Sequence, residues 1–180
     1  MPANTDGQSA SGTTGRPGPS TGRQVLALAG FLSLSFVVCM LASVPIILHS
    51  NGWFAGSTKA PWMPAGWMFR TVWIGLYACI GLSGWLVWRK GALAGRLLRS
   101  YGLQLLLNLA WPFMFFAMYP MLGSLALWLA FAVICALAGV LALLVMDAGP
   151  VQTWAGLLVL PYLSWVVFSA SLNLYSALHN

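Results

Sequence analysis

The chain contains apolar segments that are long enough to cross a lipid bilayer and carry almost no charge. Charged side chains make up 6% of its 180 residues and hydrophobic ones 60%, whereas a soluble domain usually carries about 25% charged residues. A chain with so few charges cannot cover a folded surface with groups that favour water. Lipid is the alternative solvent, and a helix of about 20 apolar residues crosses it with its backbone hydrogen bonds satisfied. The sequence therefore predicts an all-α integral membrane protein.

The apolar segments predict a bundle of five transmembrane helices in one membrane domain, residues 25–180. The helices are expected at 25–48, 67–88, 101–119, 122–146 and 154–178. Residues 1–24 are rich in glycine, serine, threonine and proline and lack a periodic apolar face, which predicts a disordered tail. A signal peptide ending near Ala42 is the alternative for the first segment, but its length and the spans that follow favour an uncleaved helix.

Basic residues gather on one side of the predicted membrane. The chain has eight lysines and arginines against two acidic residues, Asp6 and Asp147. On the amino-terminal side lie Arg16, Arg23, Arg89, Lys90, Arg96 and Arg99, against Lys59 and Arg70 on the other. The positive-inside rule then predicts a cytoplasmic amino terminus in a bacterial cell membrane, although "inside" has another meaning in an outer or organellar membrane. Because the charges follow helix ends, nucleic acid is not an expected partner.

Groups suited to acid–base or metal chemistry are scarce. Asp6 and Asp147 are both predicted outside the helices, and the chain has no glutamate. The two histidines fall near helix ends, and the three cysteines lie in separate apolar segments without metal-ligand spacing. We therefore assign no catalytic residue and expect no metal site or required cofactor. Ion-coupled transport is also disfavoured, because it usually needs an ionisable residue at mid-membrane.

Aromatic and amide side chains recur along one face of the third predicted helix. Gln104, Asn108, Trp111 and Phe115 follow one another at spacings of three or four residues, so they share a face. Two interpretations remain open. The amides form hydrogen bonds between helices and the tryptophan fills space, or the amides stand beside an aromatic wall in a pocket for a flat apolar ligand.

Aromatic stripes also follow the second and fifth predicted helices. Phe69, Trp73 and Tyr77 recur every four residues on the second helix, and a stripe on the fifth consists of Tyr162, Trp165, Ser169 and Leu172. Tryptophans near span ends are explained by a preference for the headgroup region. Trp73 and Trp165 lie further inside, so we expect the three stripes to converge on a shared pocket.

The motifs that surround these stripes resemble those of the tryptophan-rich sensory protein/translocator protein (TspO/MBR) family. The resemblance runs from about residue 25 to residue 175 and rests on motifs in the family's order. In the first connection and second helix these are Trp53-Phe54-Ala55, Pro61-Trp62-Met63-Pro64, Trp67 and Val72-Trp73. In the third and fifth helices they are Leu107-Asn108, Trp111-Pro112, Phe115-Phe116, Pro161-Tyr162-Leu163-Ser164-Trp165 and Leu172-Asn173.

The resemblance implies a five-helix membrane protein, often a homodimer, that binds porphyrins, sterols or synthetic benzodiazepine-type ligands in a pocket beneath the first connection. The residues that match the family's pocket are Trp73, Asn108, Trp111, Trp165, Ser169 and Leu172. The stripes add Phe69, Tyr77 and Gln104 to these candidates. Arg70-Thr71 stands where the family commonly has a small residue followed by a proline. Arg70 either reaches the membrane interface or pairs with a ligand carboxylate such as a porphyrin propionate.

A receptor or sensor for tetrapyrroles of the protoporphyrin type is the function that these residues favour. Two alternatives stay open: a transporter of porphyrins or other apolar molecules, and a protein that degrades bound porphyrin in light. The expected partners are the lipid bilayer, a flat apolar ligand and a second copy of the chain.

Overall fold

Helices make up most of residues 20–180, which are the residues described by the computed structural model. The long helices are α1 (Thr21–His49), α3 (Gly66–Arg89), α4 (Gly95–Pro112), α6 (Ser124–Ala148) and α7 (Thr153–His179). The shorter ones are α2 (Trp53–Gly56), α5 (Tyr119–Leu122) and a π-helical turn, η1 (Phe113–Ala117), that directly continues α4. No strand occurs within residues 20–180, so the all-α prediction is confirmed for that part of the chain.

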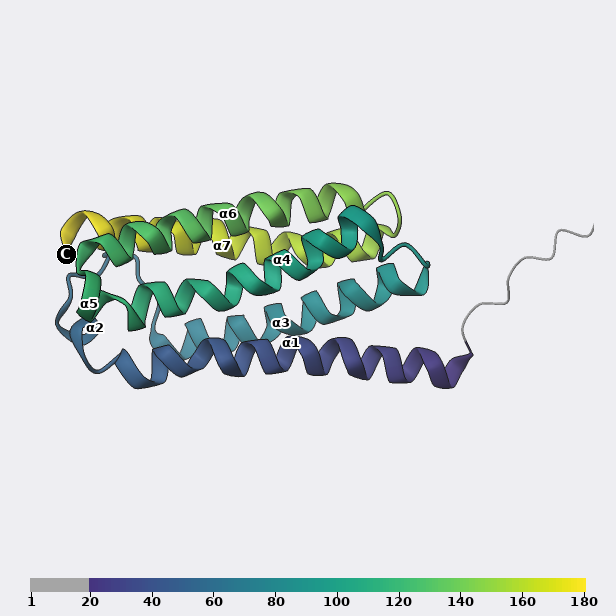
Figure 1. The fold of residues 1–180 in the computed structure, drawn as a ribbon, viewed down its shortest axis with the longest axis horizontal. Helices are drawn as coiled ribbons and strands as arrows, with labels where there is room; N and C mark the ends of the chain where they lie inside the picture. Colours follow the sequence, from purple (N-terminus) through teal and green to yellow (C-terminus); the bar gives the residue numbers. More distant parts are fainter. Residues whose placement is uncertain (1–19) are drawn as a thin grey trace, which may run out of the picture.

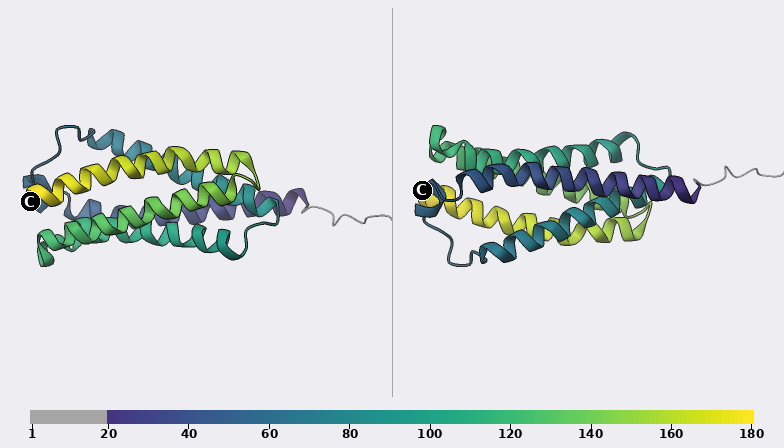
Figure 2. Two further views of the ribbon diagram at one scale, coloured as in Figure 1. Left: turned by 90° about the horizontal axis from the view of Figure 1, so that it is seen from above. Right: turned by 90° about the horizontal axis from the view of Figure 1, so that it is seen from below.

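The long helices form a closed ring, in the order α1, α3, α7, α6, α4 and back to α1 (Figures 1 and 2). Consecutive long helices run in opposite directions, as short connections require. The carboxyl terminus and α2 lie at one end of the bundle, and the start of α1 lies at the other. Side chains that point into the ring form the core, where Leu127, Ala130 and Leu141 are fully buried.

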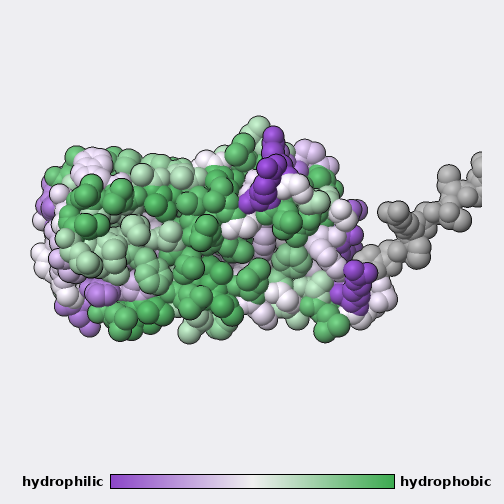
Figure 3. Space-filling view, viewed as in Figure 1, coloured by the Kyte–Doolittle hydropathy of each residue, from purple (hydrophilic) through white to green (hydrophobic). Residues whose placement is uncertain are grey.

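On the face of the ring shown in Figure 3, the surface is apolar across much of its middle and more hydrophilic towards its ends. Large aliphatic side chains point outward, including Leu26, Ile47 and Met146, which are 76%, 71% and 67% exposed. In water this surface would be unfavourable, but lipid tails solvate it. Four of the described helices, α1, α3, α6 and α7, are long and apolar enough to cross a membrane. The chain is therefore a multi-pass membrane protein.

Helix boundaries differ from the sequence prediction where polar residues extend a helix beyond its apolar part. Helix α1 begins at Thr21, so the last residues of the predicted tail 1–24 are helical, while residues 1–19 lie outside the described part. Helix α4 begins at Gly95, six residues before the predicted start at residue 101. Its first turns carry Arg96 and Arg99, and their charge led hydropathy to assign them to a connection. Long basic side chains are nevertheless compatible with a helix end, because they can reach the membrane interface.

Asp147 lies inside helix α6, so its predicted position outside the helices was wrong. The helix ends only at Ala148, because Gly149-Pro150 follows and proline cannot continue it. The Asp147 carboxylate accepts a hydrogen bond from Arg96 Nε at 2.7 Å and also pairs with Arg96 Nη2. This ion pair joins α4 to α6 at the end of the bundle where α1 begins.

The third helix was predicted to run regularly to residue 119, but its regular α-helical part ends at Pro112. After Pro112 the chain makes the π-helical turn η1, and α5 follows it. Gly123 then adopts φ +57°, which separates α5 from α6 and which side chains other than glycine rarely tolerate. The predicted fourth helix, 122–146, accordingly begins two residues later, at Ser124.

Candidate functional site

Aromatic rings from α3 and α7 form one connected cluster inside the bundle. The ring centroids of Phe69 and Trp165 lie 5.4 Å apart, and those of Phe69 and Trp73 6.2 Å apart. Trp73 in turn lies 6.0 Å from Tyr77 and 6.0 Å from Tyr162. These distances are typical of favourable tilted and edge-to-face aromatic pairs. The aromatic stripes on the second and fifth helices therefore meet in one cluster.

Asn108 of α4 meets this aromatic cluster from the opposite side of the ring. Its Nδ2 group donates a hydrogen bond to Tyr162 Oη. Asn108 and Tyr162 are 4% and 1% exposed, so the bond is shielded from solvent. Together with Trp73 and Tyr77 they border a narrow gap, whose remaining lining comes from Leu76 and Ile80. Three helices thus contribute side chains to the border of one gap.

Several polar atoms near the aromatic cluster have no hydrogen-bond partner within residues 20–180. They are Tyr77 Oη, Trp165 Nε1 and Ser169 Oγ, and all three are buried atoms. Buried polar atoms are usually hydrogen-bonded, and each unpaired one costs about 1–3 kcal/mol. Trp165 and Ser169 are four residues apart on α7, so they lie on one face. These atoms are suited to bind polar groups at the edge of a ligand.

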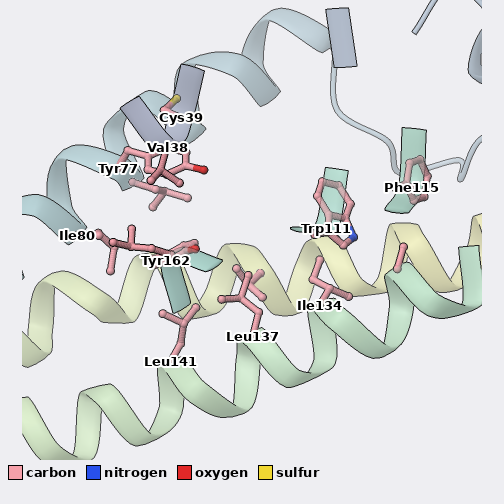
Figure 4. Close-up of a cluster of buried hydrophobic side chains, with 14 of the residues drawn as sticks. Val38, Cys39, Tyr77, Ile80, Trp111, Phe115, Ile134, Leu137, Leu141 and Tyr162 are labelled. Atoms are coloured by element: carbon pink, nitrogen blue, oxygen red, sulfur yellow. The ribbon is translucent and has the colours of Figure 1, made fainter. Parts of the chain in front are cut away.

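Trp111 lies apart from the gap, close to Phe115 (Figure 4). The two rings stack with centroids 5.5 Å apart. Trp111 Nε1 donates a hydrogen bond of 2.9 Å to Asn173 Oδ1, and Asn173 Nδ2 donates one of 2.9 Å to the Leu127 carbonyl. Asn173 is 1% exposed. Its two hydrogen bonds connect α7 to α4 and to α6. For Trp111 the structure supports the packing interpretation, in which the indole and an amide connect helices.

Replacing Asn173 tests this connection. The substitution Asn173→Leu nearly preserves volume but removes both hydrogen bonds, so we expect the free energy of unfolding to fall by about 1 kcal/mol, since such bonds average roughly 0.6 kcal/mol each within membranes. Reversible unfolding of the purified protein in mixed micelles measures the change. The control is Ser164→Ala, which removes an exposed hydroxyl that bonds only within its own helix, to the Leu160 carbonyl. Equal stability of Asn173→Leu and wild type would contradict the proposed role.

The remaining predicted site residues do not line the gap. Gln104 is fully buried on α4, one turn before Asn108, and neither of its amide atoms has a partner in the described residues. Leu172 is 5% exposed on α7. Arg70 is exposed at the start of α3, where its guanidinium turns back towards Gly66. The structure thus brings Trp73, Tyr77 and Asn108 together and leaves Arg70 at the rim of the bundle.

Sequence analysis did not assign Leu76, Ile80 or Asn173 to the site. Leu76 and Ile80 extend the face of α3 that begins with Phe69 and Trp73, so helical spacing alone identifies them. Asn173 lies four residues after Ser169, and an amide within an apolar helix is itself a signal for a polar contact between helices. Tyr162 was part of a recognised stripe, but its hydrogen bond to Asn108 was not foreseen.

The connection between α1 and α3 is fastened to the helices at this end of the bundle. Trp53 Nε1 donates a hydrogen bond to the Phe116 carbonyl at 3.0 Å, and Trp53 stacks on Tyr119 with centroids 3.8 Å apart. Further along, Thr58 and Asn180 exchange two hydrogen bonds of 2.8 and 3.1 Å. The connection between α1 and α3 is therefore an ordered cap on the end of the bundle where the carboxyl terminus lies.

Comparison with known proteins connects this arrangement to one family. The sequence profile described as "TspO/MBR family" matches residues 30–178. The chain belongs to the TspO/MBR family. It is 34% identical to the translocator protein of Ovis aries over 125 residues, which cover 67% of this chain and 70% of that protein. With the translocator protein of Homo sapiens the identity is 31% over 150 residues, covering 80% and 84%. With the tryptophan-rich sensory protein of Cereibacter sphaeroides it is 32% over 136 residues, covering 73% and 79%.

Proposed function

We propose that this TspO/MBR protein is a membrane receptor or sensor that binds tetrapyrroles between α3, α4 and α7. The observation that carries the proposal is the aromatic cluster of Phe69, Trp73 and Trp165 beside the buried amide of Asn108. Flat aromatic ligands stack on such rings, and a few polar groups fix their orientation. The printed name of the Cereibacter sphaeroides relative, a tryptophan-rich sensory protein, agrees with a sensing role.

Binding of a tetrapyrrole requires the bundle to open. The gap is too narrow to hold a water molecule, whereas ligand pockets usually measure roughly 300–1,000 Å³. Phe69, Trp73 and Trp165 are only partly buried, so their rings have room to move outward. In this proposal the described state is the closed one, and ligand selects an open state in which the same rings line a larger space.

Titration with protoporphyrin IX tests the proposed function. The purified protein is titrated in darkness, and quenching of indole fluorescence is measured. We expect saturable quenching with one site per chain, and absence of saturable binding would contradict the proposal. Repeating the titration in light and following porphyrin absorbance detects degradation, while flux into liposomes containing the protein detects transport.

Arg70 provides a more specific prediction. If its guanidinium pairs with a propionate, Arg70→Ala should weaken binding of protoporphyrin IX about tenfold, because a charged hydrogen bond is worth roughly 1.5–3 kcal/mol. The dimethyl ester of the same porphyrin carries no carboxylate, so its affinity should stay unchanged.

Lys59→Ala is the matched control for Arg70→Ala. Lys59 is the other lysine or arginine at this end of the described bundle, and its ammonium bonds to the Ala55 carbonyl within its own connection. Equal losses for acid and ester would show that Arg70 acts through its aliphatic stem. If Arg70→Ala lowers the affinity for neither ligand, Arg70 does not contact the ligand and only reaches the membrane interface.

We further propose that α4 together with η1, residues 95–117, forms the fifth membrane span. Arg23, Arg89 and Lys90 lie at the same end of the described bundle as the start of α4, which supports a cytoplasmic location for that end in a bacterial membrane. Reaction of single cysteines, introduced at each end, with a membrane-impermeant maleimide tests both points. Crosslinking in membranes tests the expected homodimer.

A further inference from the structure

A groove on the outside of the bundle lies far from the aromatic cluster, at the end where α1 begins. Its floor and walls come from one face of α1, with Ala27, Gly30, Phe31 and Leu34, and from Trp88 near the end of α3. The groove is shallow and open, with a volume of about 360 Å³. It is open towards the membrane side of the protein, and Gly30 and Leu34 are exposed along it. Its lining is mostly apolar.

Positive charge marks one end of this groove. Arg23 precedes Ala27 by four residues, so it continues the same face of α1 beyond the groove. The Arg23 guanidinium lies over the Trp88 ring at 5.9 Å. Trp85 lies one turn before Trp88 on α3, and the Arg89 guanidinium lies over its ring at 4.8 Å. Trp85 Nε1 donates a hydrogen bond of 3.1 Å to the Gln24 carbonyl of α1. Arg23 thus lies at the groove through its contact with Trp88, and Arg89 lies close by on α3.

No described carboxylate side chain neutralises these arginines. Of the chain's two acidic residues, Asp6 lies outside the described residues and Asp147 is paired with Arg96. An occupant of the groove therefore needs an apolar part that follows α1 and an anionic head that reaches Arg23. An anionic phospholipid has both parts at this spacing, because its phosphate lies at the membrane interface directly above its acyl chains.

We propose that the groove formed by α1 and Trp88 binds one anionic phospholipid, with an acyl chain over Gly30 and the phosphate at Arg23. Trp88 forms the boundary between the two parts, since its ring contacts the acyl chain on one side and the guanidinium on the other. The site is separate from the proposed tetrapyrrole site, so it is occupied whether or not that ligand binds.

Native mass spectrometry in detergent tests the proposal, with phosphatidylglycerol and phosphatidylcholine of identical acyl chains as the probes. Wild type should bind the first phosphatidylglycerol about fivefold more tightly than phosphatidylcholine, as expected for one basic side chain at a lipid headgroup. Arg23→Gln should remove this preference. Lys90→Gln removes the same charge at the same end and should keep it, whereas an equal loss for both variants would overturn the specific site in favour of general attraction.

A second pair of variants tests the acyl-chain part of the groove. A Cβ atom at Gly30 would meet no neighbouring atom within 4 Å, and the position faces the open groove, so Gly30→Leu should fold normally and fill the groove. It should lower the binding of both lipids severalfold, whereas Ala29→Leu, which places the same side chain just outside the lining, should not.

Three results would overturn the proposal: no lipid preference in wild type, unchanged lipid binding by Gly30→Leu, or tighter lipid binding after removal of residues 1–19. The last result would identify the amino-terminal segment as the occupant. Loss of dimer in Gly30→Leu at unchanged lipid binding would identify a second copy of the chain.

Discussion

The double substitution Trp73→Leu with Trp165→Leu is expected to lower the affinity for protoporphyrin IX about 30-fold. Each indole supplies one aromatic face to the proposed site, and an aromatic pair contributes roughly 1 kcal/mol beyond its buried area. Both rings are partly buried and join the cluster through Phe69. Titration in darkness, followed by porphyrin absorbance and not by indole emission, measures the affinity of a variant that has lost two of its fluorophores.

A matched double variant separates stacking from general loss of tryptophan. Trp67 and Trp154 lie on the same two helices but are 63% and 68% exposed, so Trp67→Leu with Trp154→Leu should keep the affinity of wild type. If both double variants bind porphyrin as wild type does, the ligand does not stack in this cluster. If both lose affinity equally, the effect reflects the bundle as a whole.

Gly84→Ala is expected to lower the free energy of unfolding by about 2 kcal/mol, the largest change in stability predicted here for a single methyl group. A Cβ atom at Gly84 would lie 2.6 Å from two ring carbons of Tyr101, closer than nonbonded atoms can approach. The Tyr101 ring has little freedom to move, because it is 4% exposed and its edge contacts Phe31 at 5.8 Å. Unfolding in mixed micelles measures the loss.

The same helix provides the control for Gly84→Ala. Gly75 has no atom within 4 Å of a Cβ position, so Gly75→Ala should be neutral or slightly stabilising, as alanine is a better helix former. Tyr101→Leu should in turn tolerate alanine at position 84, because the ring that causes the clash is gone. Similar losses for the two glycine variants would contradict this steric explanation and point to an effect of helix propensity.

Much of the site follows from the sequence because helical spacing determines which side chains share a face. Phe69, Trp73 and Tyr77 recur every four residues, and the structure aligns them along α3 as that period requires. The inward position of Asn108 also follows, since an amide is unfavourable in contact with lipid. What spacing does not determine is the partner across the ring. The hydrogen bond between Asn108 and Tyr162 depends on how two helices are rotated against each other.

The sequence-based predictions differ from the structure at polar groups near helix ends and inside the ring. Arg96 and Asp147 are charged, so hydropathy placed both outside the predicted helices. In the structure they lie on α4 and α6 and form an ion pair with each other. Trp111 shared a face with Asn108, but Asn173 binds its indole and holds it away from the gap. A sequence pattern reports which side chains point inward, whereas the contacts they make inside depend on the neighbouring helices.

The fastened connection between α1 and α3 bears on how fast a ligand can exchange. Opening the bundle at this end requires release of the Thr58–Asn180 and Trp53–Phe116 hydrogen bonds. If opening precedes binding, the observed association rate should level off as ligand concentration rises, because a first-order step then limits it. The same opening step would also limit the rate of dissociation. A receptor with such slow exchange reports the ligand concentration averaged over its own opening time, so brief fluctuations leave no trace in its occupancy.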